Sequence, residues 1–345
     1  MPAAYFIGVD LHQSVIQVCV LDSKGEIVEE RRFRGESLQS GLDVVKFICR
    51  HRGARVAVEA IGMNRWFVDA LKGKCDVVVV DALKLNLRSL GKKTDRRDAY
   101  EIARRLQLGD IDRNAKTYYP TDEEYGVRRI LRTRRALVKI RQMLVNNIRS
   151  ILRAYRIPQP LGHLYTKRAI KTLREVSGLS EALSFCLLEL VEQLASVQTR
   201  IANFKKRIEV EAQHPKIAAL AQELPQLGPQ TALTLVTELG DVSRFRGTRA
   251  AASYAGLVPR VSQSADKAHH GPITKRGNRD LRWVLSEWAV RLMAKNAIAR
   301  AWAAPRLKRM HKNKVRTALA RRLLVGLFIT LRRGEVFSLE HCLAA

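Results

Sequence analysis

The chain lacks the cysteine pairs that would form a zinc site or a disulfide framework. Its five cysteines are scattered, and none has CxxC or zinc-ligand spacing: Cys19, Cys49, Cys75, Cys186 and Cys342. We therefore expect reduced, buried thiols and a cytoplasmic protein. This absence argues against a disulfide-rich secreted domain and against a zinc ribbon.

Long hydrophobic runs are also missing. No apolar run approaches the roughly 18 residues that a membrane-spanning helix needs. The longest, Leu323–Leu331, has arginine on both sides. Residues 1–4 lead directly into a strand-like segment, so we expect no signal peptide. The sequence thus predicts neither membrane insertion nor secretion.

Acidic residues are scarce relative to basic ones. The 345 residues are enough for two or three domains, and they include 62 Lys and Arg but only 33 Asp and Glu, a net charge of +29. This excess is larger than solubility requires. Because neutralised phosphates release counterions and add affinity, the charge indicates a nucleic-acid partner. A ribosome-like or simply basic protein is the alternative interpretation.

The first 118 residues alternate between strand-like and helical patterns. Three strand-like segments come first, and short strands then alternate with helices. The expected strands are Tyr5–Asp10, Ser14–Leu21, Glu26–Phe33, Arg55–Glu59 and Asp76–Val80, and the expected helices are Leu38–Arg50, Arg65–Leu71 and Asp95–Leu106. This order predicts an α/β domain with a mixed sheet.

Residues 119–213 lack strand signals and repeat apolar residues at helical spacing. Two series follow such steps: Ile130, Leu137, Leu144 and Ile151, then Leu187, Leu190, Leu194, Val197, Ile201, Phe204 and Ile208. Pro158 and Pro160 mark the turn between the two series. We predict a long antiparallel helical pair, a coiled-coil region that packs on itself or on a second copy of the chain.

From residue 214 to 345 the pattern predicts a mainly α-helical domain, so that the predicted domains are residues 1–118, 119–213 and 214–345. Leu224–Ala232 reads LPQLGPQTA, in which a glycine turn precedes the start of a helix. This segment resembles half of a helix-hairpin-helix, whose backbone N–H groups can bind a phosphate. An ordinary turn between two helices is the alternative interpretation.

Two segments carry almost only positive charge. Residues 127–156 contain ten Lys and Arg and no acid, and residues 267–322 contain 16 Lys and Arg but only two acids. A solvated helix face usually mixes charges of both signs. We therefore interpret both segments as nucleic-acid surfaces, with these candidate contact residues: Arg128, Arg132, Arg135, Lys139, Lys267, Lys275, Arg276, Arg279 and Arg282.

Four acidic residues stand where strands end or a helix begins. Asp10 and Glu59 close strand-like segments, and Asp95 and Asp98 fall at i and i+3 of a helix. That spacing puts the last two on one helix face, about 5–6 Å apart at Cβ. Carboxylates that face one point suit hard divalent cations, and four of them suit two Mg²⁺ ions acting on a phosphodiester. Helix capping by Asp95 and a turn at Asp10 are the alternative interpretations.

The order of these motifs resembles a known family. Asp10 in a GVD strand, Glu59 in VEA and the segment KTDRRDA resemble the RuvC-like DEDD domain of the insertion sequence 110 transposases. The later segments GLVPR, TKRGN and LR, with Ser264 between the first two, resemble the second conserved block of that family. The resemblance spans residues 5–337, is closer in spacing to the 1111 subgroup, and extends more distantly to the Piv invertase.

The resemblance implies a site-specific recombinase that acts on its own mobile element, in a prokaryotic cytoplasm and associated with the nucleoid. It implies an RNase H-like (RuvC-like) N-terminal domain in which Asp10, Glu59, Asp95 and Asp98 bind Mg²⁺, with Mn²⁺ as the alternative. It also implies a homodimer that assembles into a tetramer. A bridge RNA would read donor and target DNA by base pairing.

The resemblance further implies that Ser264 attacks a DNA phosphate and forms a covalent protein–DNA intermediate. A serine hydroxyl is weak until a base or metal activates it, and only His269 and His270 lie close in sequence. Ala265 follows where the family often has glycine, and Ser262 is the alternative nucleophile. A serine-rich surface loop is the structural alternative. Cations near the serine would stabilise the developing phosphorane charge: Lys267, Lys275, Arg276, Arg279 and Arg282.

Two other functions are compatible with these patterns. A metal-dependent nuclease of the Holliday-junction type would hydrolyse DNA with the carboxylates and leave Ser264 structural. A non-catalytic architectural protein would leave the carboxylates unexplained, because negative charge opposes DNA unless a cation lies between them. Only the recombinase predicts a covalent protein–DNA intermediate.

Overall fold

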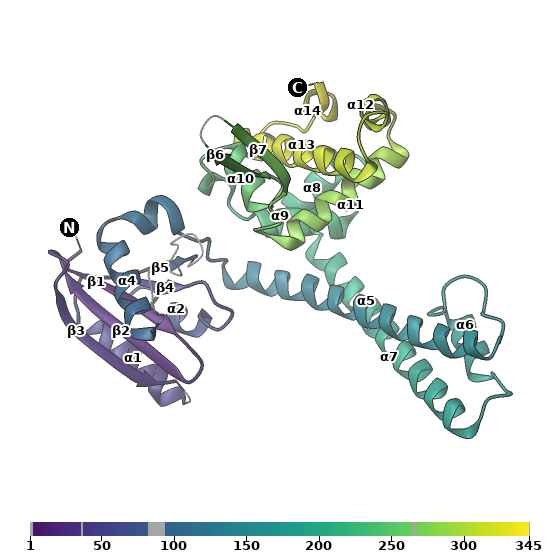
Figure 1. The fold of residues 1–345 in the computed structure, drawn as a ribbon, viewed down its shortest axis with the longest axis horizontal. Coiled ribbons are helices and arrows are strands. Elements are labelled where there is room, and N and C mark those ends of the chain that lie inside the picture. Colours follow the sequence, from purple (N-terminus) through teal and green to yellow (C-terminus); the bar gives the residue numbers. More distant parts are fainter. Residues whose placement is uncertain (1–2, 36, 82–93, 265–266, 345) are drawn as a thin grey trace. The chain divides into compact units, whose positions relative to one another are not determined.

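The computed structural model describes residues 3–35, 37–81, 94–264 and 267–344, which form two compact units (Figure 1). The N-terminal unit comprises Met1–Tyr119 and the C-terminal unit Pro120–Ala345. Each unit contains hydrophobic cores of its own. Within the described ranges, no helix is long and apolar enough to span a membrane.

The N-terminal unit is built on a mixed five-stranded sheet with the order β3-β2-β1-β4-β5. The strands are β1 (Tyr5–Leu11), β2 (Val15–Asp22), β3 (Ile27–Arg34), β4 (Ala54–Glu59) and β5 (Asp76–Val80). The pairs β1–β2 and β2–β3 are antiparallel, whereas β1–β4 and β4–β5 are parallel. The mixed sheet confirms the α/β prediction, and every predicted strand boundary lies within one residue of the observed one.

Helices cover both faces of this sheet. On one face, α1 (Leu38–Cys49) and α2 (Arg65–Leu71) bury Ile7 and Val9 of β1. On the other face, α4 (Asp95–Gln107) packs across β1, β2 and β4, and the short helix η2 (Ile111–Ala115) follows it. Because side chains alternate along a strand, the even-numbered residues of β1 point toward α4.

The C-terminal unit begins with two long helices that pack along each other in opposite directions, α5 (Asp122–Ala154) and α7 (Glu181–Glu211) (Figure 1). A capping box between Thr121 and Glu124 starts α5. The predicted simple turn differs from the structure, because α6 (Lys167–Arg174) lies between the two helices. The apolar side chains of α6 lie on one helix face and pack into the core at that end of the helical pair. This packing explains why α6 is helical.

Helices dominate the remainder of this unit, as predicted. They are α8 (Pro215–Glu223), α9 (Pro229–Leu239), η3 (Val242–Arg244), α10 (Thr248–Tyr254), α11 (Arg279–Lys295), α12 (Ala297–Leu307), α13 (Lys312–Arg333) and α14 (Leu339–Ala344). Trp288 of α11 is fully buried, and its Nε1 donates to the carbonyl oxygen of Pro225 at 2.9 Å. This bond ties the turn between α8 and α9, the LPQLGPQTA segment, to the core.

An antiparallel hairpin interrupts these helices and was not predicted from the sequence. Its strands are β6 (Pro259–Ser264) and β7 (Lys267–Ile273). Gly256 and Gly277 flank the hairpin with positive φ, +67° and +107°. A Cβ at Gly256 would overlap the carbonyl of Arg276, and one at Gly277 would overlap that of Tyr254. The glycines therefore let the GLVPR and TKRGN segments pack against each other at the base of the hairpin.

Candidate metal centre

Gly8 allows α4 to approach the central strand closely. Gly8 faces this helix, and a Cβ there would overlap backbone atoms of Ala99 and Ala103. The residues paired with Gly8 on the two neighbouring strands are Cys19 and Ala57, which are also small. This close packing brings the first turn of α4 next to the end of β1.

Asp10 is the penultimate residue of β1, and Glu59 is the last residue of β4, the adjacent parallel strand. The register places Val9 beside Val58, so Asp10 and Glu59 come next on their strands. Alternation along each strand turns both side chains toward the face that α4 covers. The buried Asn64 side chain donates to the carbonyl oxygen of Glu59 at 3.0 Å and fixes the end of β4.

The remaining two acids lie in the first turn of α4. Thr94 caps this helix, because its hydroxyl oxygen accepts a hydrogen bond from the backbone N–H of Arg97 at 3.3 Å. Asp95 is the first helical residue and Asp98 follows at i+3. The alternative in which Asp95 caps the helix is therefore wrong.

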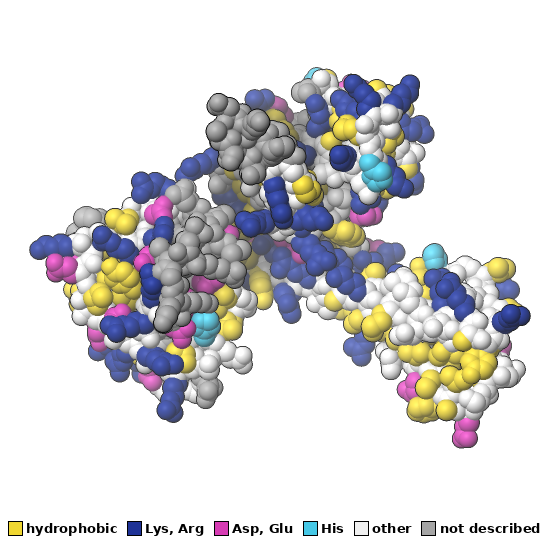
Figure 2. Space-filling model, viewed as in Figure 1, with side chains coloured by type: hydrophobic (Ala, Val, Ile, Leu, Met, Phe, Trp, Pro, Cys, Tyr) yellow, Lys and Arg dark blue, Asp and Glu magenta, His cyan; other side chains and the backbone are white. Residues whose placement is uncertain are grey.

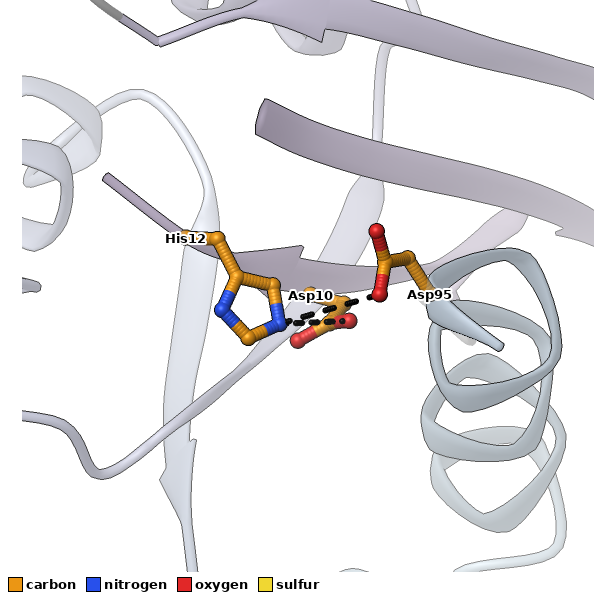
Figure 3. A group of neighbouring side chains, drawn as sticks. All are labelled: Asp10, His12 and Asp95. Carbon is orange, nitrogen blue, oxygen red and sulfur yellow. Dashed lines mark ion pairs between the residues drawn. The ribbon is translucent and has the colours of Figure 1, made fainter. Parts of the chain in front are cut away.

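Three side chains come within metal-ligand distance of one another, as Figure 3 shows. One ligand atom from each of Asp10, His12 and Asp95 lies within 4.8 Å of the other two. His12 Nε2 is 3.2 Å from Asp10 Oδ2 and 3.9 Å from Asp95 Oδ1. Glu59 and Asp98 are not part of this three-residue group, although their charges act on Asp10.

The electrostatics connect all four predicted acids. Burial raises the pKa of Asp10 to about 6, His12 opposes that rise, and the negative charges of Asp95, Asp98 and Glu59 add to it. Only 3% of Asp10 is exposed. Within the described part of the chain, its Oδ2 accepts no hydrogen bond of ordinary geometry. A buried carboxylate in this condition is unfavourable unless a cation neutralises it.

The donor set fits a divalent metal ion. Carboxylate oxygens are the ligands that Mg²⁺ and Mn²⁺ prefer, and a neutral imidazole nitrogen is a common further ligand. The buried, unsatisfied oxygen of Asp10 is the position at which a cation would relieve the most unfavourable charge. The group can therefore hold a cation that polarises a phosphodiester.

His12 was missed in the sequence interpretation, although a signal for it exists. Residues 8, 10 and 12 share one side of an extended chain because strand side chains alternate. His12 directly follows β1 and is exposed, so its imidazole reaches the same point as Asp10. A search for ligand-type residues at i+2 from a strand-end acid would have found it.

Ser264 is the last residue of β6, and its backbone pairs with Lys267 of β7 at the tip of the hairpin. The side chains of residues 261–270, which include Ser262, His269 and His270, lie outside the described part of the structure, as does all of Ala265. The roles expected for these residues and for the side chain of Lys267 therefore stay predictions.

Three of the candidate nucleic-acid contacts on α5 are engaged inside the C-terminal unit. Arg128 is buried and donates to the carbonyl oxygen of Thr237 at 2.7 and 3.0 Å. Arg132 donates to Glu238 at 3.0 Å and to Asp280 at 3.0 Å, and Arg135 also pairs with Asp280. These arginines fasten α5 to α9 and α11. The sequence predicted that Arg128 lies on an exposed nucleic-acid surface, because this segment carries only positive charge. The structure instead buries Arg128.

The remaining candidate contacts fall into two groups. Arg282 donates to the carbonyl oxygen of Ala255 at 2.9 Å and so holds the base of the hairpin. The others for which side chains are described are exposed: Lys139, Lys275, Arg276 and Arg279. Figure 2 shows Lys and Arg side chains gathered over the C-terminal unit, with few acidic ones among them.

Family models match most of the chain. The model described as "Transposase IS116/IS110/IS902 family" matches residues 218–304. A transposase model for the DEDD domain of the IS110 type matches residues 7–157, which contain the carboxylates. A DEDD domain implies that catalysis depends on a divalent metal, in agreement with the group around Asp10.

Full-length relatives give the same result. The transposase for insertion sequence element IS1111A of Coxiella burnetii is 26% identical over 338 residues, 96% of this chain and 90% of the relative. The transposase for IS1328 of Yersinia enterocolitica is 24% identical over 98% of this chain and all of the relative. A Sinorhizobium fredii relative is 30% identical over 275 residues, 71% of this chain and 67% of its own length. The chain therefore belongs to the IS116/IS110/IS902 family of transposases, enzymes that cut and rejoin the DNA of insertion sequences.

Proposed function

We propose that this transposase binds Mg²⁺ with Asp10, Glu59, Asp95 and Asp98 and attacks DNA with Ser264. Asp10 carries the metal part of the proposal, because its buried carboxylate has a raised pKa and three further acids around it. Such a cluster costs stability in the absence of a cation. We add His12 to the ligand set, since its Nε2 lies 3.2 Å from Asp10 Oδ2.

The proposed reaction is a phosphoryl transfer to serine. The Oγ of Ser264 forms a bond to phosphorus while the bond to a deoxyribose oxygen breaks, and that oxygen takes up a proton. The proton of the serine hydroxyl passes to a base. A bound Mg²⁺ supplies Lewis-acid stabilisation of the developing charge. Of the cations predicted to stabilise the phosphorane, Lys267 is the one whose backbone pairs with that of Ser264. Attack by the terminal hydroxyl of a second strand on the phosphoserine rejoins DNA and releases the enzyme.

The architecture and partners belong to the same proposal. The N-terminal unit would be an RNase H-like (RuvC-like) domain, and α5 with α7 a coiled coil, within a division at residues 1–118, 119–213 and 214–345. The chain would act as a homodimer that assembles into a tetramer, with a bridge RNA that pairs with donor and target DNA. The net charge of +29 supports a nucleic-acid partner. A distant relation to the Piv invertase stays a prediction.

The decisive experiment asks whether protein becomes linked to DNA. Purified protein, Mg²⁺, copurified RNA and DNA carrying the joined ends of the element are mixed and run on a denaturing gel. We expect an adduct with the wild-type chain and none with Ser264→Ala or Asp98→Ala. Glu26→Gln, which changes an exposed acid in the turn before β3, is the matched control and should keep the adduct.

The alternative outcomes are informative. Cleaved DNA without an adduct would move the protein to the Holliday-junction-type nucleases. An adduct that Ser264→Ala keeps and Ser262→Ala loses would reassign the nucleophile. Digestion of the copurified RNA before the reaction tests the guide: strand exchange should stop, and it should return when intact RNA is added. Exchange that continues without RNA would contradict guidance.

A further inference from the structure

A groove of about 1130 Å³ runs between the base of the β6–β7 hairpin and α13. Its floor is apolar and includes Ile273, Val325 and Ile329. Its sides carry five cationic side chains: Lys275, Lys314, Arg316, Arg321 and Arg322. None of the described residues that line it is acidic. The groove therefore combines an apolar floor with a positively charged rim.

Most of the rim cations differ from the arginines of α5 in lacking ion pairs with described residues. Lys275, Lys314, Arg316 and Arg321 form no ion pair with any residue in the described ranges, unlike the arginines of α5. Only Arg322 is tied inward, where its Nη1 lies 3.4 Å from the carbonyl oxygen of Cys342. No described acidic residue therefore pairs with the positive charges on the rim.

The position of Lys314 gives a further indication that the groove binds a negatively charged ligand. Lys314 lies in the first turn of α13, which has no acidic residue. A helix N-terminus carries partial positive charge, so a cation there is electrostatically unfavourable for folding. A negatively charged ligand would offset the unfavourable charge of Lys314 at this helix N-terminus.

Lys275 gives an independent indication. It is exposed, and its backbone has φ of +52°, a left-handed conformation that side-chain-bearing residues seldom adopt. Such conformations cost free energy and concentrate at ligand-binding positions. Here the strained residue is a lysine on the rim of the groove.

We propose that this groove binds one strand of nucleic acid, with phosphates on the cationic rim and sugars and bases on the apolar floor. An apolar floor suits unpaired bases, and a cationic rim follows a phosphodiester backbone without reading its sequence. The hairpin pairs Pro259 with Ile273 at its base and Ser264 with Lys267 at its tip. Five residues of strand span about 17 Å. The groove residues therefore bind the strand a few nucleotides from Ser264, a consequence that rests on the proposed function.

The test removes two rim charges from the full-length chain. The probe is fluorescein-labelled oligothymidylate of about 20 nucleotides, with matched oligouridylate and a matched duplex in parallel arms. We expect Lys314→Gln/Arg321→Gln to weaken single-strand affinity about tenfold at low salt and to reduce the slope of log affinity against log salt by about 1.4. The control is Lys167→Gln/Lys171→Gln on α6, which removes two exposed charges outside the groove and outside both basic segments and should change neither quantity.

Several outcomes decide the proposal. Equal affinity and equal salt slope for the groove variant and its control would overturn it, as would a loss confined to the duplex probe. A loss for DNA, for RNA or for both supports it and says which strand the groove takes. An unchanged melting temperature shows that the variant is folded. Cross-links from an iodouracil-substituted oligonucleotide should fall on β7 and α13, and cross-links confined to the N-terminal unit would refute the site.

The groove and the serine chemistry can fail separately. Ser264→Ala should keep full oligonucleotide affinity, and the groove variant should still form the covalent adduct when DNA is saturating. An absent adduct in every variant, with affinity lost only in the groove variant, would overturn the serine and leave the groove standing. The reverse pattern would remove the groove alone.

Discussion

Two buried carboxylates, one in each unit, have opposite surroundings. Glu238 is 1% exposed and accepts hydrogen bonds from Arg132 at 3.0 Å and from Asn278 at 2.7 Å, with Arg128 3.7 Å away. Asp10 is 3% exposed, and among the described residues the charges that act on it are those of His12 and of three other acids. The fold neutralises the first carboxylate from within, whereas we propose that a bound cation neutralises the second. Burial of an acid alone therefore does not identify a functional site, and the sign of its neighbours does.

Removing the charge of Glu238 should give the largest effect. Glu238→Gln keeps the shape of the side chain but removes the buried negative charge that lies 3.7 Å from Arg128 and 3.0 Å from Arg132. We expect a loss of about 3 kcal/mol in the free energy of unfolding, measured with urea. No change in that free energy would remove the distinction between the two carboxylates.

Divalent metal should raise the free energy of unfolding through binding at Asp10 and not at Glu238. At a metal concentration of about 100 times the dissociation constant, ligand binding raises the free energy of unfolding by about 2.7 kcal/mol. Mg²⁺ or Mn²⁺ should therefore raise the melting temperature of wild type and of Glu26→Gln, but not that of Asp10→Asn. Equal shifts in all three proteins would show that the metal binds elsewhere.

Removing the charge of Asp10 should change the free energy of unfolding in the opposite direction to removing the charge of Glu238. With chelator present at about pH 7, Asp10→Asn relieves repulsion and desolvation, and we expect it to stabilise the protein by about 1–3 kcal/mol. The measurement is the same urea titration. A destabilised Asn variant would mean that Asp10 is already neutralised by groups of the protein.

The stability difference between the wild type and Asp10→Asn should depend on pH. Since the pKa of Asp10 is raised from 3.8 to about 6, the folded protein binds a proton that the unfolded chain releases in this range. The metal-free wild type should therefore gain stability relative to Asp10→Asn as the pH falls from about 7 to about 5. A difference that stays constant with pH would show that Asp10 does not titrate there.

Removing the charge of an exposed ion pair should give the smallest change in stability, against which the effect of Glu238→Gln can be compared. Glu192 of α7 accepts hydrogen bonds from Arg174 of α6 at 2.6 and 2.9 Å, but water surrounds both side chains. Exposed pairs are screened and contribute little. Glu192→Gln should leave the urea midpoint unchanged. A loss comparable to that of Glu238→Gln would mean that burial does not explain the first prediction.

The sequence predicted local patterns well and long-range pairing poorly. The strands of the N-terminal unit and the start of α4 at Asp95 follow from periodicity and capping, which are local. The burial of Arg128 does not, because its acceptor, the carbonyl of Thr237, is 109 residues away. Residues 259–273 include prolines, a glycine and polar residues rather than the β-branched runs that indicate strands, so the hairpin was also missed.

The candidate site shows the same division. Spacing and strand ends selected the four acids, and the charges of the other three all act on Asp10. His12 went unnoticed because only acidic residues were considered at the strand ends, although it stands two residues after Asp10. The single-signed charge of α5 predicted a surface for nucleic acid, and Glu238 and Asp280 pair with three of its arginines from distant helices. Counter-ions that are remote in sequence are invisible until the chain is folded.

Gly8 has no functional group, yet it sets the distance between the strand that carries Asp10 and the helix that carries Asp95 and Asp98. The position of the proposed metal site thus depends on the missing side chain of Gly8 as much as on the ligands. Transplanting the four acids into another sheet with a larger residue at this place would not transplant the site. For anyone redesigning the enzyme, the smallest residue in β1 is as fixed a requirement as the carboxylates themselves.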